Sequence, residues 1–345
     1  MGHATRCIPI VRSLLSNGYK VLIAASAEQK IFLQQEFPQI EFLELKGYAI
    51  RYSKTRWFFF FKLLLQAPRF LSTIKYEYLW LDKIIDEHKI DLVISDNRFG
   101  LHSKKCPCIF ITHQLTIKMA FALIETVIQK INYSYINHFT ACWVPDAAEK
   151  INAAGILSHP KKLPAIPVHY IGLLSRFKKN PVTEKKYGYC IVLSGPEPQR
   201  TILEKLILKD IDTIAGKTLL VRGLPASEEI IQAALTVEIK NYLPGTEMQQ
   251  AFDQSETIIS RSGYTTVMEI LSMQKKSILV PTPGQSEQEY LADFLQNQGL
   301  IFTISQNKFS IINAIQQAKK FSYSSITLPV FNDEKLKELM LLIQL

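Results

Sequence analysis

The sequence predicts an α/β protein of two domains, each with a parallel sheet covered by helices. Three observations lead to this fold class. The chain has 345 residues, of which 47% are hydrophobic, and this is enough to bury two cores. Short β-branched runs alternate with stretches of helical spacing, which is typical of parallel sheets with helical connections. A polar, basic stretch broken by Pro181 lies between the two halves and predicts a linker.

The net charge of +9 favours anionic partners, such as nucleotide-sugars, anionic lipid surfaces or nucleic acid. Nucleic acid is the weakest of these, because the basic residues are dispersed and no recognised binding module is visible. The five cysteines are too few and too irregularly spaced for a disulfide framework, and they indicate reduced thiols. No stretch has the length of a transmembrane helix and no signal peptide is visible, so we expect a cytoplasmic protein.

The first predicted domain spans residues 1–172 and contains five strand signals. These signals lie at residues 21–25, 41–45, 92–95, 108–112 and 141–144. The helix signals include an amphipathic stretch from Ile8 that Gly18 ends, and the ranges 72–88 and 117–138. Ligands of such sheets bind beyond the carboxyl ends of the strands.

After a linker at residues 173–187, the second predicted domain spans residues 188–331. Its strand signals lie at residues 189–193, 218–222, 237–242, 257–260 and 277–280, and its helix signals at 198–208 and 264–273. Ser286 and Glu289 have the spacing of a capping box, which places the start of another helix there. A closing helix is predicted for residues 332–345.

The strand at residues 257–260 is followed by the turn Arg261-Ser262-Gly263 and then directly by a helix. Such a turn directs free backbone N–H groups and the positive end of the helix dipole at whatever lies above the sheet. Gly263 is free to take a positive φ, and we expect Ser262 to offer its hydroxyl and Arg261 to supply a fixed cation. The turn therefore suits a phosphate or a diphosphate.

Glu269 lies further along the same helix, where a carboxylate can accept two hydrogen bonds from a vicinal diol such as a ribose. Gln285, Gln288 and Glu289 come from the next loop and helix start, where they are placed to hold the hydroxyls of a sugar. The alternative interpretation is an ordinary strand–helix unit with a solvated turn and a surface glutamate.

The stretches SRSGYTTVMEI and VPTPGQSEQEYLA resemble the carboxy-terminal, donor-binding domain of the GT-B glycosyltransferases of family 28. The resemblance extends more weakly over nearly the whole chain, and it implies two Rossmann-like domains that face each other across a crevice. It also implies that the turn at residues 261–263 faces the diphosphate of a UDP-sugar and that Glu269 binds the ribose. Gln288 and Glu289 would contact the donor sugar. The family usually has a second Gln at the position of Glu289, which leaves the identity of the sugar open.

The resemblance assigns further positions to the donor. Gly195 lies in a turn that resembles the family's loop near the donor phosphates, and Tyr242 and Leu243 stand where the family holds the uracil ring. The closing helix would cross back to the first domain. Asp210-Ile211-Asp212 matches a metal-binding motif of the other glycosyltransferase fold, but it lies away from the predicted crevice. We therefore expect neither a metal nor a cofactor.

Gly2 and His3 match the end of the glycine-rich loop that follows the first strand in this family. That strand is missing before Gly2, so we expect that it is encoded upstream or that the protein lacks it. In several inverting GT-B families a histidine in this loop is the general base, and the resemblance gives His3 that role. Asp96 would orient the ring, as in a His–Asp pair. The alternatives are a helix-cap histidine and an Asx-turn aspartate.

Other polar residues follow two strands of the first domain. Asn97 and Arg98 come after one strand and His113 after the next. We expect these residues to face the same crevice as His3, on the acceptor side, with His113 as a second candidate for the base.

Residues 51–70, RYSKTRWFFFFKLLLQAPRF, place cations around Trp57 and four successive phenylalanines. Aromatic residues among Lys and Arg are typical of a surface that contacts anionic lipid. The alternative is a helix packed on the sheet, in which the four phenylalanines cannot all face one side.

The sequence and the resemblance together predict an inverting glycosyltransferase that moves a hexose or an N-acetylhexosamine from a UDP-sugar to the hydroxyl of an acceptor, with a lipid-linked acceptor as one case. Peripheral contact with the inner face of the plasma membrane would accompany such an acceptor. A UDP-sugar epimerase of the GT-B fold and a non-catalytic nucleotide-sugar-binding protein remain as alternatives. Only the transferase should release UDP in a way that depends on an acceptor.

Overall fold

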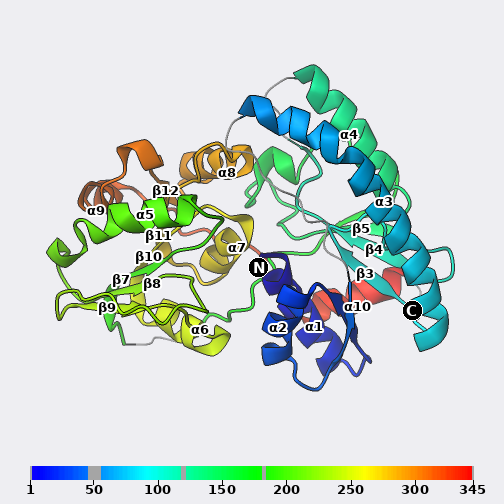
Figure 1. The fold of residues 1–345 in the computed structure, drawn as a ribbon, viewed down its shortest axis with the longest axis horizontal. Helices are drawn as coiled ribbons and strands as arrows, with labels where there is room; N and C mark the ends of the chain where they lie inside the picture. The colour runs from blue at the N-terminus through cyan, green and yellow to red at the C-terminus, as the bar shows by residue number, and fades with distance from the viewer. Residues whose placement is uncertain (1, 46–55, 118–121, 181–183, 344–345) are drawn as a thin grey trace. The chain divides into compact units, whose positions relative to one another are not determined.

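The computed structural model describes residues 2–45, 56–117, 122–180 and 184–343, and for residues 56–67 and 122–124 it describes only the backbone. The chain forms two compact units (Figure 1). One unit comprises Met1–Leu174 together with Pro329–Leu345, and the other comprises Ser175–Leu328. The second unit is therefore one continuous stretch, and the C-terminal end of the chain belongs to the first.

The first unit contains two parallel sheets, one with the strand order β3-β4-β5-β6 and one in which β1 pairs with β2. The strands are β1 (Leu22–Ala25), β2 (Glu41–Glu44), β3 (Val93–Asp96), β4 (Cys108–Ile111), β5 (Ala141–Val144) and β6 (Val168–Tyr170). The helices are α1 (Gly2–Ser16), α2 (Ala27–Glu36), α3 (Arg56–His88), α4 (Ala122–Ile136) and the short 3-10 helix η1 (Gly155–Leu157). The sequence did not predict β6, because its three half-buried residues form no clear apolar run.

The middle of the larger sheet is buried on both faces. Every residue of β4 (CIFI) and β5 (ACWV) is buried, as the continuous apolar pattern of a central parallel strand requires. Side chains of α3 and α4 pack against these strands in one core cluster. A separate cluster joins α1 and α2 to the β1–β2 sheet.

The C-terminal end of the chain packs within the first unit. α10 (Asp333–Leu342) lies beside α1 (Figure 1), and the Ser13 hydroxyl donates a hydrogen bond to the Asp333 carboxylate. Leu173 and Val330 form a short parallel bridge. Gly172 has φ +80°, and the carbonyl carbon of Val330 is 3.1 Å from the position that a Cβ of residue 172 would take. Gly172 is therefore needed both for its backbone angle and for this close approach.

The second unit contains one six-stranded parallel sheet with the order β12-β11-β10-β7-β8-β9. The strands are β7 (Tyr187–Val192), β8 (Thr218–Val221), β9 (Val237–Lys240), β10 (Ser255–Ser260), β11 (Lys276–Leu279) and β12 (Phe302–Thr303). The helices are α5 (Gln199–Leu208), η2 (Ile211–Thr213), α6 (Gly245–Asp253), α7 (Tyr264–Ser272), α8 (Ser286–Asn297), η3 (Gln306–Lys308) and α9 (Ile311–Lys320). One core cluster joins α5 and α9 to the sheet. The predicted α/β class, with parallel sheets in two units, is confirmed.

The start of α8 differs from the prediction. The N-cap is Gln285 rather than Ser286, and no side chain caps the helix, so the predicted capping box is wrong. Oε1 of Glu289 instead accepts a hydrogen bond from the backbone N–H of Gly284, at 2.9 Å. Gly284 has φ +81°, and this left-handed turn lets the chain enter the helix one residue earlier than the capping box would.

The predicted lipid-facing segment, residues 51–70, lies largely outside the described residues. Residues 51–55 are not described, and for residues 56–67 only the backbone of α3 is described, so the prediction for Trp57 and the four phenylalanines lies outside the described side chains. Within the described parts of the chain, no helix is both long enough and apolar enough to cross a bilayer.

Candidate functional site

The predicted donor residues lie at one edge of the sheet in the second unit. Gly195 follows β7, residues 242–243 follow β9, Arg261 follows β10, and Gln285 lies between β11 and α8. The strands of this sheet are parallel, so all these loops leave from its carboxyl edge. That edge is where α/β proteins of this type bind their ligands.

Gly263 is the N-cap of α7 and has φ −69° and ψ 137°. The turn therefore does not use the freedom of a glycine to take a positive φ, because these angles are open to any residue. No atom lies within 4 Å of the position that a Cβ would take, so the packing does not require a glycine here either. Because residue 263 has no side chain, open space lies before the first N–H groups of the nine-residue helix α7. An anion binds favourably at such a helix N-terminus.

Gly195 contributes a similar opening at the neighbouring strand. No atom lies within 4 Å of its Cβ position, and its φ of +104° makes a glycine necessary. Because β7 and β10 pair directly, the loop that contains Gly195 and the turn at residues 261–263 leave from adjacent strands. Open space beside the backbone in two adjacent loops suits a ligand with two phosphate groups.

Arg261 is buried, with 2% of its surface exposed, so the alternative of a solvated turn does not describe this residue. Its guanidinium donates to the backbone carbonyls of Val280 (3.2 Å), Pro281 (3.3 Å) and Gln199 (2.6 Å), and to Oε1 of Gln306 (2.6 Å). All these acceptors are neutral, and Nε has no hydrogen-bond partner. Burial lowers the pKa of Arg261 to about 10. The side chain thus ties the ends of β10 and β11 to α5 while its charge stays uncompensated within the described residues.

Ser262 is fully buried, and its hydroxyl donates to the backbone carbonyl of Gln288 at 2.9 Å. The expectation that this hydroxyl is available to a phosphate is therefore wrong. The bond fastens the start of α8 to the turn before α7.

Glu269 is also buried, with 4% of its surface exposed, so the alternative of an exposed surface glutamate is excluded. Its Oε1 accepts a hydrogen bond from Nε of Arg176 at 2.7 Å. Burial raises the pKa of Glu269, and Arg176 acts in the opposite direction without cancelling the rise. Oε2 makes no hydrogen bond to a described residue, so one carboxylate oxygen is left for a ligand.

Sequence reasoning missed Arg176. It lies in the stretch predicted to be a solvated linker, and its side chain is instead mostly buried, 4.5 Å above the ring of Phe177. No periodicity or motif marks the residue, and only the tertiary contact with Glu269 gives it a place in the site.

Gln285, Gln288 and Glu289 shape the loop between β11 and α8. Oε1 of Gln288 accepts from the backbone N–H of Thr282 at 2.9 Å, and its Nε2 donates to Oε1 of Gln285 at 2.6 Å. Each amide keeps further donor and acceptor capacity, because one bond at each atom does not exhaust it. The loop is therefore held in shape by the same side chains that were predicted to contact the donor sugar, and that role stays a prediction.

Tyr242 and Leu243 lie between β9 and α6. Tyr242 is half-buried and Leu243 is buried, so only the tyrosine presents a substantial surface to a ligand. Their contact with a nucleotide base also stays a prediction.

In the first unit, the structure brings His3, Asp96 and His113 together around Arg6. Nδ1 of His3 is 3.1 Å from Oδ2 of Asp96. Arg6 donates from Nε to Oδ1 of Asp96 at 2.9 Å, bonds the same oxygen through Nη2, and lies 3.1 Å from Nδ1 of His113 through Nη1. Arg6 was missed by sequence reasoning, although its place one turn after His3 on α1 is a usable signal.

The cluster fixes the hydrogen-bonding role of Nδ1 in both histidines. Burial alone would raise the pKa of Asp96, but Arg6 and His3 outweigh it and hold that pKa well below its usual range. The ionised carboxylate can only accept, so Nδ1 of His3 donates to it, and in the neutral ring the lone pair lies on Nε2. The side chain of His3 is 51% exposed, which leaves Nε2 accessible. Nδ1 of His113 accepts from Arg6, so His113 is buried with its lone pair occupied and does not fit the role of a base.

The two remaining acceptor-side residues have structural roles. Arg98 donates from Nε to Oε1 of the fully buried Glu77 at 2.8 Å, which holds its guanidinium, and its contact with an acceptor stays a prediction. Asn97 has φ +56°, and its backbone N–H donates to the carbonyl of Ile111 at 3.1 Å. It therefore forms the left-handed turn that ends β3, a conformation that Asn tolerates well.

One aspartate of the Asp210-Ile211-Asp212 motif also has a structural role. Oδ1 of Asp212, in η2, accepts from the backbone N–H of Ala234 at 2.8 Å. Among the described residues, no group of three or more His, Cys, Asp and Glu side chains has the arrangement of a metal site.

Comparison with protein families and known proteins agrees with this geometry. Residues 223–328 match the model of the glycosyltransferase family 28 C-terminal domain, a range that includes the turn at 261–263, α7 and α8. The UDP-N-acetylglucosamine--N-acetylmuramyl-(pentapeptide) pyrophosphoryl-undecaprenol N-acetylglucosamine transferase of Glaesserella parasuis serovar 5 (strain SH0165) is similar over 337 residues at 24% identity. The match covers 91% of this chain and 86% of the relative.

Two solved structures are similar over almost the whole chain. The glycotransferase of kitacinnamycin has a TM-score of 0.65 at 13% identity, over 99% of this chain and 92% of that one. MurG of Acinetobacter baumannii has a TM-score of 0.54 at 14% identity, over 99% of this chain and 91% of that one. At these identities the likeness concerns the fold, and the predicted GT-B architecture is confirmed. The chain is a glycosyltransferase of the GT-B fold that carries the family 28 C-terminal domain.

Proposed function

We propose that this protein moves a hexose or an N-acetylhexosamine from a UDP-sugar to a hydroxyl of a lipid-linked acceptor, with inversion at the anomeric carbon. The name of the Glaesserella parasuis relative supports both the donor class and the acceptor class. One observation of the second unit carries the proposal. The open helix N-terminus at Gly263 adjoins Arg261, a buried cation with no carboxylate partner among the described residues.

In this proposal the diphosphate binds at the N-terminus of α7 and beside Gly195. Arg261 acts through its field rather than by direct contact, since the side chain is buried and its Nη1 and Nη2 groups already bind backbone carbonyls and Gln306. Because four neutral acceptors fix the guanidinium, its charge needs no reorganisation when negative charge develops on the leaving UDP. Oε2 of Glu269 accepts from a ribose hydroxyl while Arg176 holds Oε1.

The chemical step assigns His3 as the general base and Asp96 as the residue that orients it. Nε2 of His3 takes the proton of the acceptor hydroxyl as the oxygen forms its bond to the anomeric carbon. The bond from that carbon to the β-phosphate oxygen breaks on the opposite side, and UDP leaves with the electron pair. Arg6 shares Asp96, which keeps the carboxylate ionised and His3 in one tautomer.

We also propose peripheral contact with anionic lipid, which access to a lipid-linked acceptor would require. Exposed apolar side chains alternate with lysines on two helices that share one core cluster. Leu71, Lys75 and Leu79 recur every fourth residue on α3, and Val127, Lys130 and Ile131 lie on α4. A face of this composition favours the headgroup region of a membrane.

Two measurements test the proposed function. A thermal-shift panel of nucleotide-sugars should show stabilisation by a UDP-sugar, of roughly 2.7 kcal/mol at 100 times its dissociation constant. The stabilising donor is then incubated with a polyprenyl-diphosphate-linked sugar, and the product should be a glycoside of inverted configuration. An isomeric UDP-sugar formed without an acceptor would support the epimerase instead. Stabilisation without any turnover would support a non-catalytic binding protein.

A further inference from the structure

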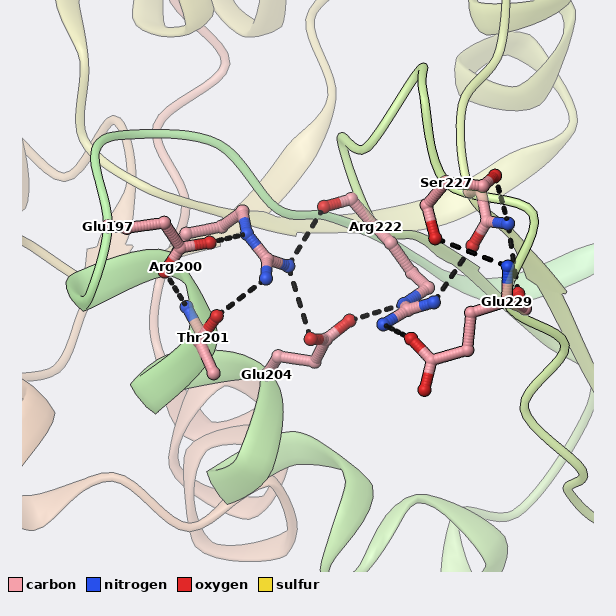
Figure 2. Close-up of polar contacts among 8 residues, drawn as sticks. Glu197, Arg200, Thr201, Glu204, Arg222, Ser227 and Glu229 are labelled. Atoms are coloured by element: carbon pink, nitrogen blue, oxygen red, sulfur yellow. Dashed lines mark hydrogen bonds and ion pairs between the residues drawn. The ribbon is translucent and has the colours of Figure 1, made fainter.

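Two buried arginines share one buried glutamate at the carboxyl edge of the sheet in the second unit. Glu204 lies on α5, Arg200 lies one turn before it, and Arg222 directly follows β8. Oε2 of Glu204 accepts from Nη1 of Arg200 at 3.1 Å, and Oε1 accepts from Nε of Arg222 at 2.6 Å. Figure 2 shows the carboxylate of Glu204 between the two guanidinium groups.

Arg200 connects Glu204 to the loop after β7. Its Nε donates to Oε1 of Glu197 at 2.6 Å, in the same loop as Gly195. The backbone N–H of Thr201 donates to the other oxygen of Glu197 at 3.2 Å. The loop that is proposed to meet the diphosphate is therefore fastened to α5 through Arg200.

Arg222 connects Glu204 to the segment after β9. Its Nη1 donates to Oδ1 of Asn241 at 2.9 Å, and Asn241 directly precedes Tyr242. Its Nη2 donates to Oε2 of Glu229 at 2.8 Å, and Nδ2 of Asn241 donates to the carbonyls of Ser227 and Glu229 at 2.8 and 2.9 Å. These bonds hold the connection between β8 and β9 at residues 222–236. Every residue of this stretch is described, and none of them is helical.

Stability alone explains this cluster poorly. Burying ion pairs costs desolvation, and apolar residues of similar volume often serve a fold equally well. Each guanidinium group instead presents several N–H donors in one plane, so the two arginines fix the directions of the hydrogen bonds that they donate. One carboxylate thus sets the geometry of two loops that emerge from β7 and β9, with β8 between them in the sheet.

We infer that Glu204 is a positioning residue of the donor site, which through Arg200 and Arg222 fixes the loop of Gly195 relative to the segment of Tyr242. The inference rests on the proposed function, in which these two loops meet the diphosphate and the base of one nucleotide. A ligand that contacts both loops gains affinity from their fixed spacing, since it does not have to order them on binding. A ligand that contacts only one loop gains much less.

Calorimetric titration with UDP and with uridine tests this difference. UDP contacts both loops, whereas uridine lacks the phosphates that reach the loop of Gly195. Glu204→Gln keeps the volume but removes the charge that both arginines share, and it should weaken UDP binding by about tenfold. Uridine binding should change by less than about twofold. The matched control is Ile207→Val, a buried position on the same helix, which lowers the melting temperature without touching the cluster and should alter neither affinity.

Arg200→Lys is the second variant, in case Glu204→Gln does not fold. A lysine keeps the charge but cannot bond Glu197 and Glu204 in the same fork, so it should also weaken UDP selectively. Equal losses for UDP and uridine, or no loss for either, would overturn the inference in either variant. Wild-type protein that binds neither ligand would instead overturn the proposed function, and that result is visible before any variant is compared.

Discussion

Glu269→Gln provides the sharpest test of the donor site, because it removes one charge from a buried position and keeps the volume. Arg176 occupies Oε1, so the structure leaves only Oε2 for a ribose hydroxyl. One charge-assisted hydrogen bond contributes about 1.5–3 kcal/mol. Its loss corresponds to a UDP affinity about 10–100-fold weaker, at about 1.4 kcal/mol for each factor of ten.

The assay is calorimetry of UDP and its 2′-deoxy analogue in both proteins, with the melting temperature of each unliganded protein as a check on folding. Wild type should bind the deoxy nucleotide less tightly than UDP, and Glu269→Gln should discriminate much less, because the partner group is already impaired. Equal discrimination in both proteins would refute the reasoning and place the ribose elsewhere.

The pH dependence of UDP affinity follows from the same residue. Burial raises the pKa of Glu269 above its ordinary value of 4.5, so the carboxylate takes up a proton at a higher pH than a surface glutamate does. Protonation removes the charge that accepts from the ribose. Wild-type affinity should therefore fall as the pH is lowered through this raised pKa. The ratio of wild-type to Glu269→Gln affinity isolates the effect from titration of the phosphates, and a ratio that is constant with pH would contradict it.

Three further predictions concern other residues. His3→Ala should lower kcat by ~10²–10⁴-fold and leave UDP affinity unchanged, because the imidazole acts on the acceptor; weakened UDP binding with normal kcat would reverse its role. Gly263→Ala should change the melting temperature only slightly, because alanine restricts the unfolded chain but is a poorer N-cap than glycine, yet it should weaken UDP binding by filling the open space before α7; unchanged UDP affinity would contradict the anion site. Leu79→Ser with Ile131→Ser should release the protein from vesicles of anionic lipid without unfolding it, because these side chains are 53% and 52% exposed; retention on the vesicles would show that another surface binds lipid.

The sequence predicted most of the strands because their apolar patterns are local. β4 and β5 are continuous apolar runs, and the turn before α7 follows from its Gly and the helical spacing after it. The carboxyl edge of the second sheet could be predicted for the same reason, since parallel strands place their following loops together. The two-residue strand β12 could not, because so short a run carries no pattern.

The sequence predicted the element on which a residue lies much better than the group to which its side chain is bonded. Ser262 and Arg98 lie where the sequence placed them, but each is bonded inward, to Gln288 and to Glu77. Sequence reasoning missed Arg6 and Arg176, whose carboxylate partners lie 90 and 93 residues away in the chain. A pattern in the sequence places a residue on an element, whereas a buried ion pair depends on which other element packs against it.

The most direct test of the central claim is the rate of UDP release from the UDP-sugar that stabilises the protein, measured with and without a polyprenyl-diphosphate-linked sugar, in wild type and in His3→Ala. We predict rapid release only when wild-type protein and acceptor are both present, and a rate about 10²–10⁴-fold lower for His3→Ala. Release that is equally fast without an acceptor, or undiminished in His3→Ala, would contradict the account.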